Sequence, residues 1–301
     1  MADPSGPVRP APPVRVVHEW EHGRAGSRCR ASTVFLVGAR CPFACVFCDL
    51  GQYTVDGPTP AGAITAQLEW ALAQVPHRDR IKLYNASNFF DDQAIPPAED
   101  DAIAQRLHEF DEVVVECHPR LVGDRCVAFA KRLSGHLQVA LGLETVHAGS
   151  LERLNKGMTL GDFDGAARRL RHHAIGLRAF VLVGVPFLAA ADQTAWTRRT
   201  VDHAVAQGAT HVSLIPVRAQ DELARLATTD QWRPTTLGQF ESIVAEAIRT
   251  HGTRAQADLW DLDQLSTCPT CLPARRRRLE AMNRDGRVRP AATCSRCKSD
   301  D

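Results

Sequence analysis

The chain has 301 residues, of which 44% are hydrophobic and 24% are charged, and its formal net charge is +1. This composition is typical of a soluble globular enzyme, and the near-neutral charge gives no general case for binding nucleic acid or a membrane surface. Residues 1–14 are rich in proline and lack the apolar segment of a signal peptide, so we expect a loose tail there. No run approaches the roughly 18 apolar residues of a membrane span, and we expect a cytoplasmic protein.

Short apolar segments rich in β-branched residues alternate with amphipathic ones, which predicts buried strands joined by helices. Strands are predicted over residues 34–39, 81–86, 112–117, 137–143, 177–185 and 212–217, with a weaker one over 257–262. Helices are predicted over residues 59–76, 163–176, 201–208 and 240–248. This alternation predicts an α/β fold with a parallel sheet, either an open or closed barrel or a doubly wound sheet. Its active site is expected beyond the carboxyl ends of the strands.

Cys41, Cys45 and Cys48 lie within eight residues, in the loop after the first predicted strand. Clustered thiols in a chain without secretion signals are more typical of metal ligands than of disulfides. Three thiolates can hold a [4Fe–4S] cluster and leave one iron open to a small molecule. The alternatives are incidental cysteines or a structural zinc loop, which would need a fourth ligand and normally has paired cysteines.

The pattern C-x-x-x-C-x-x-C, with Phe47 directly before its last cysteine, resembles the signature of the radical S-adenosylmethionine (radical SAM) superfamily. The segments 82–91, 113–120, 142–145 and 154–157 are similar to the Elongator-type branch, and most similar to the radical SAM subunit of archaeosine synthase and its uncharacterised bacterial relatives. The resemblance covers about residues 30–262. It implies a partial (β/α)6 TIM-like barrel that binds a [4Fe–4S] cluster and S-adenosylmethionine, and it implies an electron donor of flavodoxin or ferredoxin type.

The same resemblance implies reductive cleavage of S-adenosylmethionine to a 5′-deoxyadenosyl radical that abstracts hydrogen from a substrate. Asn85, Ser87 and Asn88 follow the second predicted strand, where the superfamily contacts the methionine amino nitrogen, although the common Gly-Gly-Glu is missing here. Arg120 is a candidate for the methionine carboxylate, because a guanidinium binds a carboxylate bidentately. Each of these has an alternative role as a helix cap or salt-bridge partner. Residues 155–156 could meet substrate, but a solvated loop is expected there.

Further residues at predicted strand ends complete the cofactor and substrate candidates. Glu144 is the candidate for the ribose hydroxyls, because an acid at the end of an apolar strand is costly to bury without a partner. Gly184 would let the adenine approach the backbone, and its alternative is a simple turn. Glu116 and the neighbouring Cys117 and His118 are the catalytic candidates, the last two as donors of a hydrogen atom or proton. For Cys117 the alternative is packing in the core.

The C-terminal residues 263–301 are predicted to form a small basic module after an N-terminal extension (1–30) and the barrel (31–262). Two C-x-x-C pairs predict a four-cysteine zinc site, with an auxiliary iron–sulfur cluster or no metal as the alternatives. The four ligands are Cys268, Cys271, Cys294 and Cys297. The run of arginines at 275–278 is compatible with RNA binding through phosphates, or with a basic helix face that pairs with the rest of the chain.

Three functions are compatible with these features. The first is a radical SAM enzyme acting on a modified nucleoside, in tRNA by resemblance to archaeosine synthase. The second is the same chemistry on a small metabolite or natural-product intermediate. The third is a non-catalytic iron–sulfur or zinc regulator that senses iron or redox state.

Overall fold

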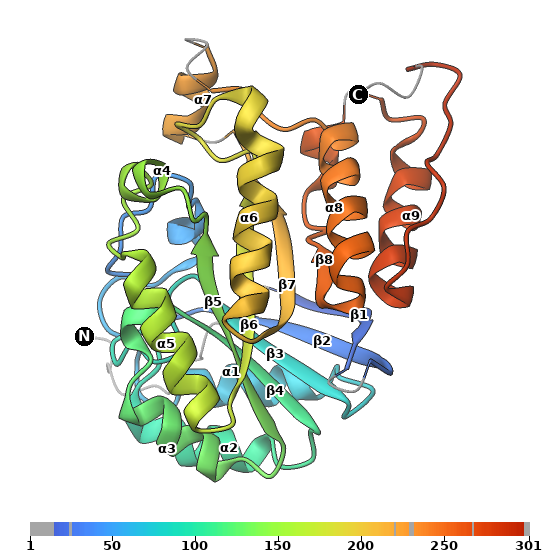
Figure 1. Cartoon of the computed structure of the whole chain (residues 1–301). Coiled ribbons are helices and arrows are strands. Elements are labelled where there is room, and N and C mark those ends of the chain that lie inside the picture. The colour runs from blue at the N-terminus through green and yellow to red at the C-terminus, as the bar shows by residue number, and fades with distance from the viewer. Residues whose placement is uncertain (1–14, 24–25, 220, 229–231, 267, 298–301) are drawn as a thin grey trace, which may run out of the picture.

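The computed structural model describes residues 15–23, 26–219, 221–228, 232–266 and 268–297. Within these, the strands form one curved eight-stranded sheet in sequence order (Figure 1). β1 is antiparallel to β2, and each later neighbouring pair is parallel. The strands are β1 (Arg15–His22), β2 (Arg28–Leu36), β3 (Arg80–Asn85), β4 (Glu112–Cys117), β5 (His136–Glu144), β6 (Gly176–Val183), β7 (Ala209–Pro216) and β8 (Ala255–Ala257). The tail predicted over residues 1–14 lies outside the described residues.

Helices connect the parallel strands and cover the outer side of the sheet (Figure 1). They are α1 (Ala63–Leu72), α2 (Asp100–Arg106), α3 (Asp124–Arg132), α4 (Ala148–Arg153), α5 (Leu160–His172), α6 (Gln193–Ala206), α7 (Asp221–Thr228), α8 (Leu237–His251) and α9 (Leu272–Asp285). Short 3-10 helices span Leu50–Tyr53, Pro97–Glu99, Pro119–Leu121, Ala190–Asp192, Gly252–Arg254 and Leu262–Leu265. Among the described residues, no helix is both long and apolar enough to cross a membrane.

Side-chain alternation along the strands separates a dry face from a polar one. In β3, Ile81 and Leu83 are buried in the helix-side core, whereas Lys82 and Tyr84 line a cavity on the concave face. Successive residues of a strand point to opposite faces, so one segment serves both the core and the cavity. The structure confirms the α/β barrel-type fold. The sequence predicted strands with apolar residues on both faces. The concave face of the sheet is instead lined by many polar residues.

Three strands differ from the sequence expectation. The first predicted strand, over 34–39, is β2 (Arg28–Leu36), which begins six residues earlier and ends three residues earlier. β1 (Arg15–His22) was not predicted, because His18, Glu19 and Glu21 interrupt its apolar residues and it is too polar to read as a buried strand. It nevertheless pairs along its whole length with β2. The weak last strand forms at Ala255–Ala257 rather than over 257–262, where the chain instead turns into a 3-10 helix.

Glu21 explains why a polar β1 is needed. Its carboxylate lies on the cavity side of the sheet and is buried with three cations. Its oxygens lie 2.5 Å from Arg80 Nη1, 2.7 Å from Arg178 Nη2 and 2.8 Å from Lys82 Nζ. Burial alone would raise the pKa of Glu21, but the charges of Arg178, Lys82 and Arg80 hold it well below the usual value. β1 therefore supplies the counter-ion that two later strands require.

Replacing Glu21 by glutamine should destabilise the chain strongly, because it leaves three buried cations without their shared anion. Removing one partner of a buried ion pair costs about 3–5 kcal/mol. We expect a loss of that size in the free energy of unfolding, measured by urea denaturation. Glu69→Gln is the matched control, since Glu69 pairs with Arg106 at the surface and such pairs contribute about 0–1 kcal/mol. Equal losses in the two variants would contradict this account.

Candidate active site

A cavity of ≈ 1100 Å³ occupies the concave side of the sheet. Its walls come from β1, β3, β6, β7 and β8, from the segment after Cys48, and from α9. Three of the predicted strand-end residues, Asn85, Glu116 and Glu144, line it together with Phe47 and Cys48. The carboxyl ends of β3, β4 and β5 and the three-cysteine loop therefore meet at one end of this cavity.

The three-cysteine loop follows β2 and is held from below by the segment after α4. Val46 N–H donates to the Leu154 carbonyl over 3.0 Å, and Asn155 Nδ2 donates to the Ala44 carbonyl over 2.9 Å. Phe47 packs with Leu154 in a small apolar cluster beneath the loop. The path of the three-cysteine loop is thus fixed by the segment that follows α4 and by this apolar cluster.

The groups around the cysteines are suited to thiolates that bind a metal centre. Asn88 Nδ2 donates to Cys41 Sγ over 3.5 Å. Burial raises the pKa of the Cys45 thiol to about 12, and it is the first cause of the raised pKa of Cys48. Thiols with pKa values this high become thiolates only when a metal replaces the proton. Three thiols in one partly exposed loop are a donor set that fits an iron–sulfur cluster.

Glu144 and Lys156 form a buried ion pair beside this loop. Lys156 Nζ lies 2.7 Å from Glu144 Oε1, and both side chains are at most 10% exposed. Glu144 has a φ of 63°, and a bulge in β5 at this point turns its side chain toward the cavity. A Cβ at Gly142 would collide with both charged groups, so a larger residue there would force the ion pair to move. The solvated loop expected at residues 155–156 is therefore wrong for Lys156, which turns inward to neutralise a buried acid.

Asn85 and Ser87 present polar atoms that have no partner among the described residues. Asn85 Nδ2 and Ser87 Oγ are both buried and make no hydrogen bond. Buried polar groups are normally paired, and an exception beside a cavity calls for a ligand. The Asn85 backbone N–H is already used, since it donates to the carboxylate of Glu116. These two side chains are suited to bind the polar end of a small molecule.

Glu116 faces the cavity, and burial raises its pKa to about 8. The Asn85 backbone N–H and the charge of Lys156 oppose this shift without cancelling it. At neutral pH the carboxyl group is therefore largely protonated and can donate a hydrogen bond into the cavity.

This shift makes stability depend on pH. The unfolded chain loses the Glu116 proton near the ordinary value of 4.5, whereas the folded chain keeps it up to about pH 8. Its contribution is therefore complete below pH 4.5 and is lost as the pH rises through 8. Between about pH 5 and pH 8 we expect the free energy of unfolding of the cluster-free chain to fall relative to Glu116→Gln, by roughly 1–3 kcal/mol. A constant difference between the two proteins across this range would contradict the raised pKa.

Cys117, His118 and Arg120 are not among the residues that line the cavity. Cys117 is buried in the helix-side core, where burial raises its pKa above the ordinary value. The His118 ring stacks on Phe43 with centroids 3.7 Å apart. Its Nε2 lies 3.0 Å from the Lys156 carbonyl and its Nδ1 accepts from the Arg120 N–H. Burial lowers the pKa of His118 to about 4, so the ring is neutral and both nitrogens are engaged.

Arg120 and Gly184 also make protein contacts at their positions. Arg120 Nη1 donates to the Gly157 carbonyl over 3.0 Å and supports the loop that carries Lys156. Gly184 has a φ of 81°, and a Cβ there would collide with Thr235. Its carbonyl accepts from Trp232 Nε1 over 2.8 Å. These contacts explain an arginine and a glycine at these positions without a cofactor.

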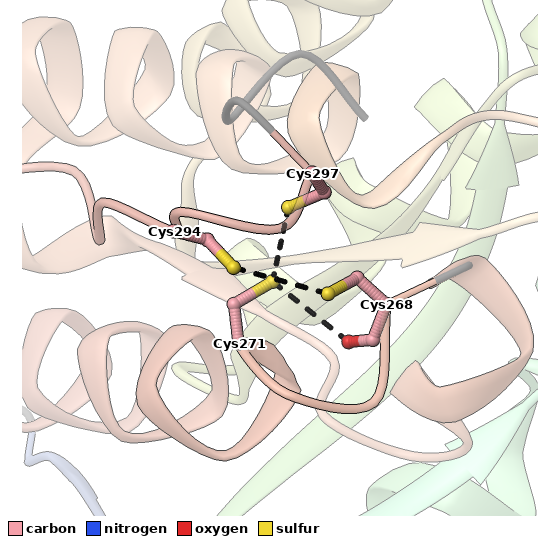
Figure 2. A group of neighbouring side chains, drawn as sticks. All are labelled: Cys268, Cys271, Cys294 and Cys297. Carbon is pink, nitrogen blue, oxygen red and sulfur yellow. Dashed lines mark hydrogen bonds between the residues drawn. The ribbon is translucent and has the colours of Figure 1, made fainter.

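The four C-terminal cysteines converge, as their spacing predicts. Figure 2 shows their sulfurs facing one another from two separate segments of the tail. All four sulfurs lie within 4.8 Å of one another. A backbone hydrogen bond from Cys271 is the main cause that lowers the pKa of Cys268 to about 6. The site is suited to a metal ion that binds thiolates.

The arginine run next to these cysteines is used mainly inside the molecule. Arg275 and Arg278 lie 2.7 and 3.0 Å from the carboxylate of Glu241 on α8. Arg276 Nη1 donates to the Leu259 carbonyl over 2.9 Å. These three contacts show that the arginines pair with the rest of the chain. Such pairing is the alternative to RNA binding that the sequence left open.

Known proteins provide the remaining evidence for the family. No protein-family model matches the chain. Over 262 residues it is 24% identical to archaeosine synthase subunit beta of Methanosarcina acetivorans, covering 81% of this chain and 75% of the relative. Its fold is similar to methylornithine synthase, with a TM-score of 0.54, 12% identity and coverage of 75% of this chain and 63% of the other. For Elp3 of Methanocaldococcus infernus the TM-score is 0.51 at 13% identity, covering 75% and 56% of the two chains. The chain therefore shares its fold with these two solved structures.

This shared fold is consistent with the resemblance to the Elongator-type radical SAM branch that the sequence indicated. In this fold the three-cysteine loop stands over the end of the cavity lined by Asn85, Glu116 and Glu144. The chain spans less than two thirds of the length of both solved structures. Lys156 was expected in a solvated loop that could meet substrate, and its ion pair with Glu144 is what sequence reasoning missed. The signal that could have found it was the acid at the end of β5, which required a buried cation as partner.

Proposed function

We propose that this chain is a radical SAM enzyme whose Cys41, Cys45 and Cys48 hold a [4Fe–4S] cluster. The observation that carries the proposal is that Phe47 and Cys48 of the three-cysteine loop line the same cavity as Asn85, whose Nδ2 is buried without a partner. Ser87 Oγ, two residues further along the chain, is also buried and unpaired. When bound, the cluster supplies the electron that divides S-adenosylmethionine into methionine and a 5′-deoxyadenosyl radical, which takes hydrogen from a substrate. Because clustered cysteines that bind metals are typical of reducing compartments, we place the protein in the cytoplasm with a flavodoxin- or ferredoxin-type donor.

The chain's own residues bind and orient the cofactor. Asn85 and Ser87 are assigned to the polar methionine end, because their side chains have hydrogen-bonding capacity to spare. Lys156 bonds one oxygen of Glu144, and we assign the other oxygen to the ribose hydroxyls. Lys156 also places a positive charge near Cys41 and Cys45, which offsets part of the negative charge that thiolates bring to the site. Arg120 and Gly184 act in this scheme by supporting the surrounding loops.

Electron paramagnetic resonance of the reduced, anaerobically reconstituted chain tests the cofactor assignment. S-adenosylmethionine that binds an open iron changes the cluster's electronic environment, so the spectrum should change when it is added. The same spectrum with and without S-adenosylmethionine would contradict the assignment. An Asn85→Ala, Ser87→Ala double variant should retain the cluster and require a higher S-adenosylmethionine concentration, because it lacks both unpaired groups.

For the substrate, we propose a modified nucleoside in RNA. The sequence relative carries the name archaeosine synthase subunit beta, and the tRNA assignment rests on extending this resemblance to the substrate. The cavity mouth adds a physical argument, because Trp20 and Tyr53 line it while remaining 49% and 44% exposed. Exposed aromatic rings at a mouth can stack on unpaired bases. Arg15, which lies 4.8 Å over the Trp260 ring, adds positive charge to the same wall.

A small metabolite is the second candidate, and the paired arginines of the tail favour it. Arg275, Arg276 and Arg278 are used within the chain, which reduces the positive charge available for phosphates. Deoxyadenosine formation with and without bulk tRNA separates the two. Stimulation by tRNA that weakens as salt rises from about 50 to 200 mM supports the nucleoside, because phosphate contacts release counterions. No effect of tRNA at either salt concentration would contradict it.

A further inference from the structure

The C-terminal cysteines have the spacing of ligands to one metal ion. Cys268 Sγ lies 3.9 Å from Cys294 Sγ, and Cys271 Sγ lies 3.6 Å from Cys297 Sγ (Figure 2). Four sulfurs about 2.3 Å from a tetrahedral zinc ion are about 3.8 Å apart. A cubane cluster gives each cysteine its own iron and keeps the sulfurs farther apart. The geometry therefore fits zinc, and binding would release the remaining thiol protons to solvent.

The metal ligands lie directly at the start of α9 (Leu272–Asp285). Cys271 is the residue before the helix, and the Leu272 N–H donates to the Cys268 carbonyl over 3.3 Å. The side chain of Arg275, one turn into the helix, hydrogen bonds to Cys271 as well as pairing with Glu241. Four thiolates on a divalent ion carry a net negative charge, and this guanidinium is placed to offset it.

α9 covers the edge where the curved sheet is open. It packs against both β1 and β8, the first and last strands (Figure 1). Leu279 and Met282 are completely buried in the main core. The side-chain amide of Asn283 satisfies backbone groups at the edge of the sheet. It accepts from the Ala257 N–H and donates to the Ala257 carbonyl, each over 2.8 Å. The tail is therefore docked on the barrel through its helix and is not a module standing apart.

The other side of the same helix forms a wall of the cavity. Arg276, Glu280, Asn283 and Arg284 all line it. The segment that follows the helix returns to its start, where Cys294 and Cys297 meet Cys268 and Cys271. A metal ion bound by all four cysteines would tie the start of α9 to this returning segment, and so would hold α9 in place as a wall of the cavity. We propose that the four-cysteine site binds one zinc ion, and that this ion holds α9 as the wall that closes the active-site cavity between β8 and β1.

The metal content of the full chain tests the first half of this proposal. We expect one zinc per chain in the wild type and in a Cys41, Cys45, Cys48 triple alanine variant. A Cys294→Ser, Cys297→Ser double variant should lose it. Ser295→Ala is the matched control, because Ser295 is exposed in the same turn and should leave zinc unchanged. Iron and sulfide retained by the triple variant would overturn the zinc assignment, as would a wild type without zinc.

Hydrogen–deuterium exchange tests the second half. Loss of zinc should accelerate exchange at α9 and at the Ala257 amide, which Asn283 protects, by about tenfold or more. α5 (Leu160–His172) should be unaffected and serves as the internal reference. Removing zinc from the wild type with a chelator and restoring it gives the same comparison without substitution, should the variant fold poorly. Unchanged exchange at α9 after zinc loss would overturn the proposal. Neither readout requires S-adenosylmethionine, so failure here is distinct from failure of the radical SAM assignment.

Discussion

Cys48→Ala is expected to abolish iron–sulfur loading and S-adenosylmethionine cleavage together. Cys48 is one of the three thiols in the loop, and it lines the cavity beside Phe47. With only two thiolates left, two of the four irons of a [4Fe–4S] cluster have no protein ligand, whereas the wild type leaves one iron open. After anaerobic reconstitution we expect iron near background and no deoxyadenosine above a reaction without protein.

Cys29→Ala provides the matched control for this loss. Cys29 is a buried cysteine in β2, on the same strand that leads into the loop, but it lies away from the cavity. This variant should retain the wild-type iron content and activity. Because both substitutions remove one sulfur, the comparison separates ligand loss from a general effect on folding. Wild-type iron content in Cys48→Ala would exclude Cys48 as a ligand.

Lys156→Met is expected to produce the second large effect, in stability and in cofactor binding at once. The substitution leaves Glu144 buried without its partner at 2.7 Å. Breaking such a pair costs about 3–5 kcal/mol, which we expect in the free energy of unfolding measured by urea denaturation of the cluster-free chain. S-adenosylmethionine binding should weaken as well, because the position of Glu144 would no longer be fixed.

A double variant, Glu144→Gln with Lys156→Met, identifies the cause. Removing both charges also removes the uncompensated buried carboxylate, so most of the lost stability should return. Binding of S-adenosylmethionine should stay weak in the double variant, because the proposed partner of the ribose is altered. Additive losses of stability in the two single variants and their combination would show that the ion pair is not the source of the effect.

The parallel part of the sheet could be predicted from the sequence because apolar runs mark strands packed against helices. β4 (Glu112–Cys117) has the bounds that its run of valines predicted. β1 was not predicted, because its charged residues Glu19 and Glu21 interrupt the apolar pattern. Both are compensated by cations on other strands, namely Lys82, Arg80 and Arg178. Polar residues whose partners are distant in the chain give no local periodic signal.

The candidate site likewise has parts that local sequence spacing predicts and parts that depend on contacts distant in the chain. The three-cysteine loop and the four-cysteine site could be predicted, because ligand spacing is local in the sequence. Asn85, Glu116 and Glu144 followed from the rule that strand ends converge, and all three line the cavity. His118 satisfies the same rule, yet it does not line the cavity and its ring stacks on Phe43. The direction of a side chain at a strand end depends on bulges and turns that the sequence pattern does not reveal.

The deoxyadenosine formed by the reduced, reconstituted wild-type chain tests the central claim most directly. With dithionite and S-adenosylmethionine under strict exclusion of oxygen, we expect deoxyadenosine and methionine in equal amounts, and none without reductant. A chain that carries a full [4Fe–4S] cluster and binds S-adenosylmethionine but forms no deoxyadenosine would contradict the enzymatic assignment. That result would favour the iron or redox regulator instead.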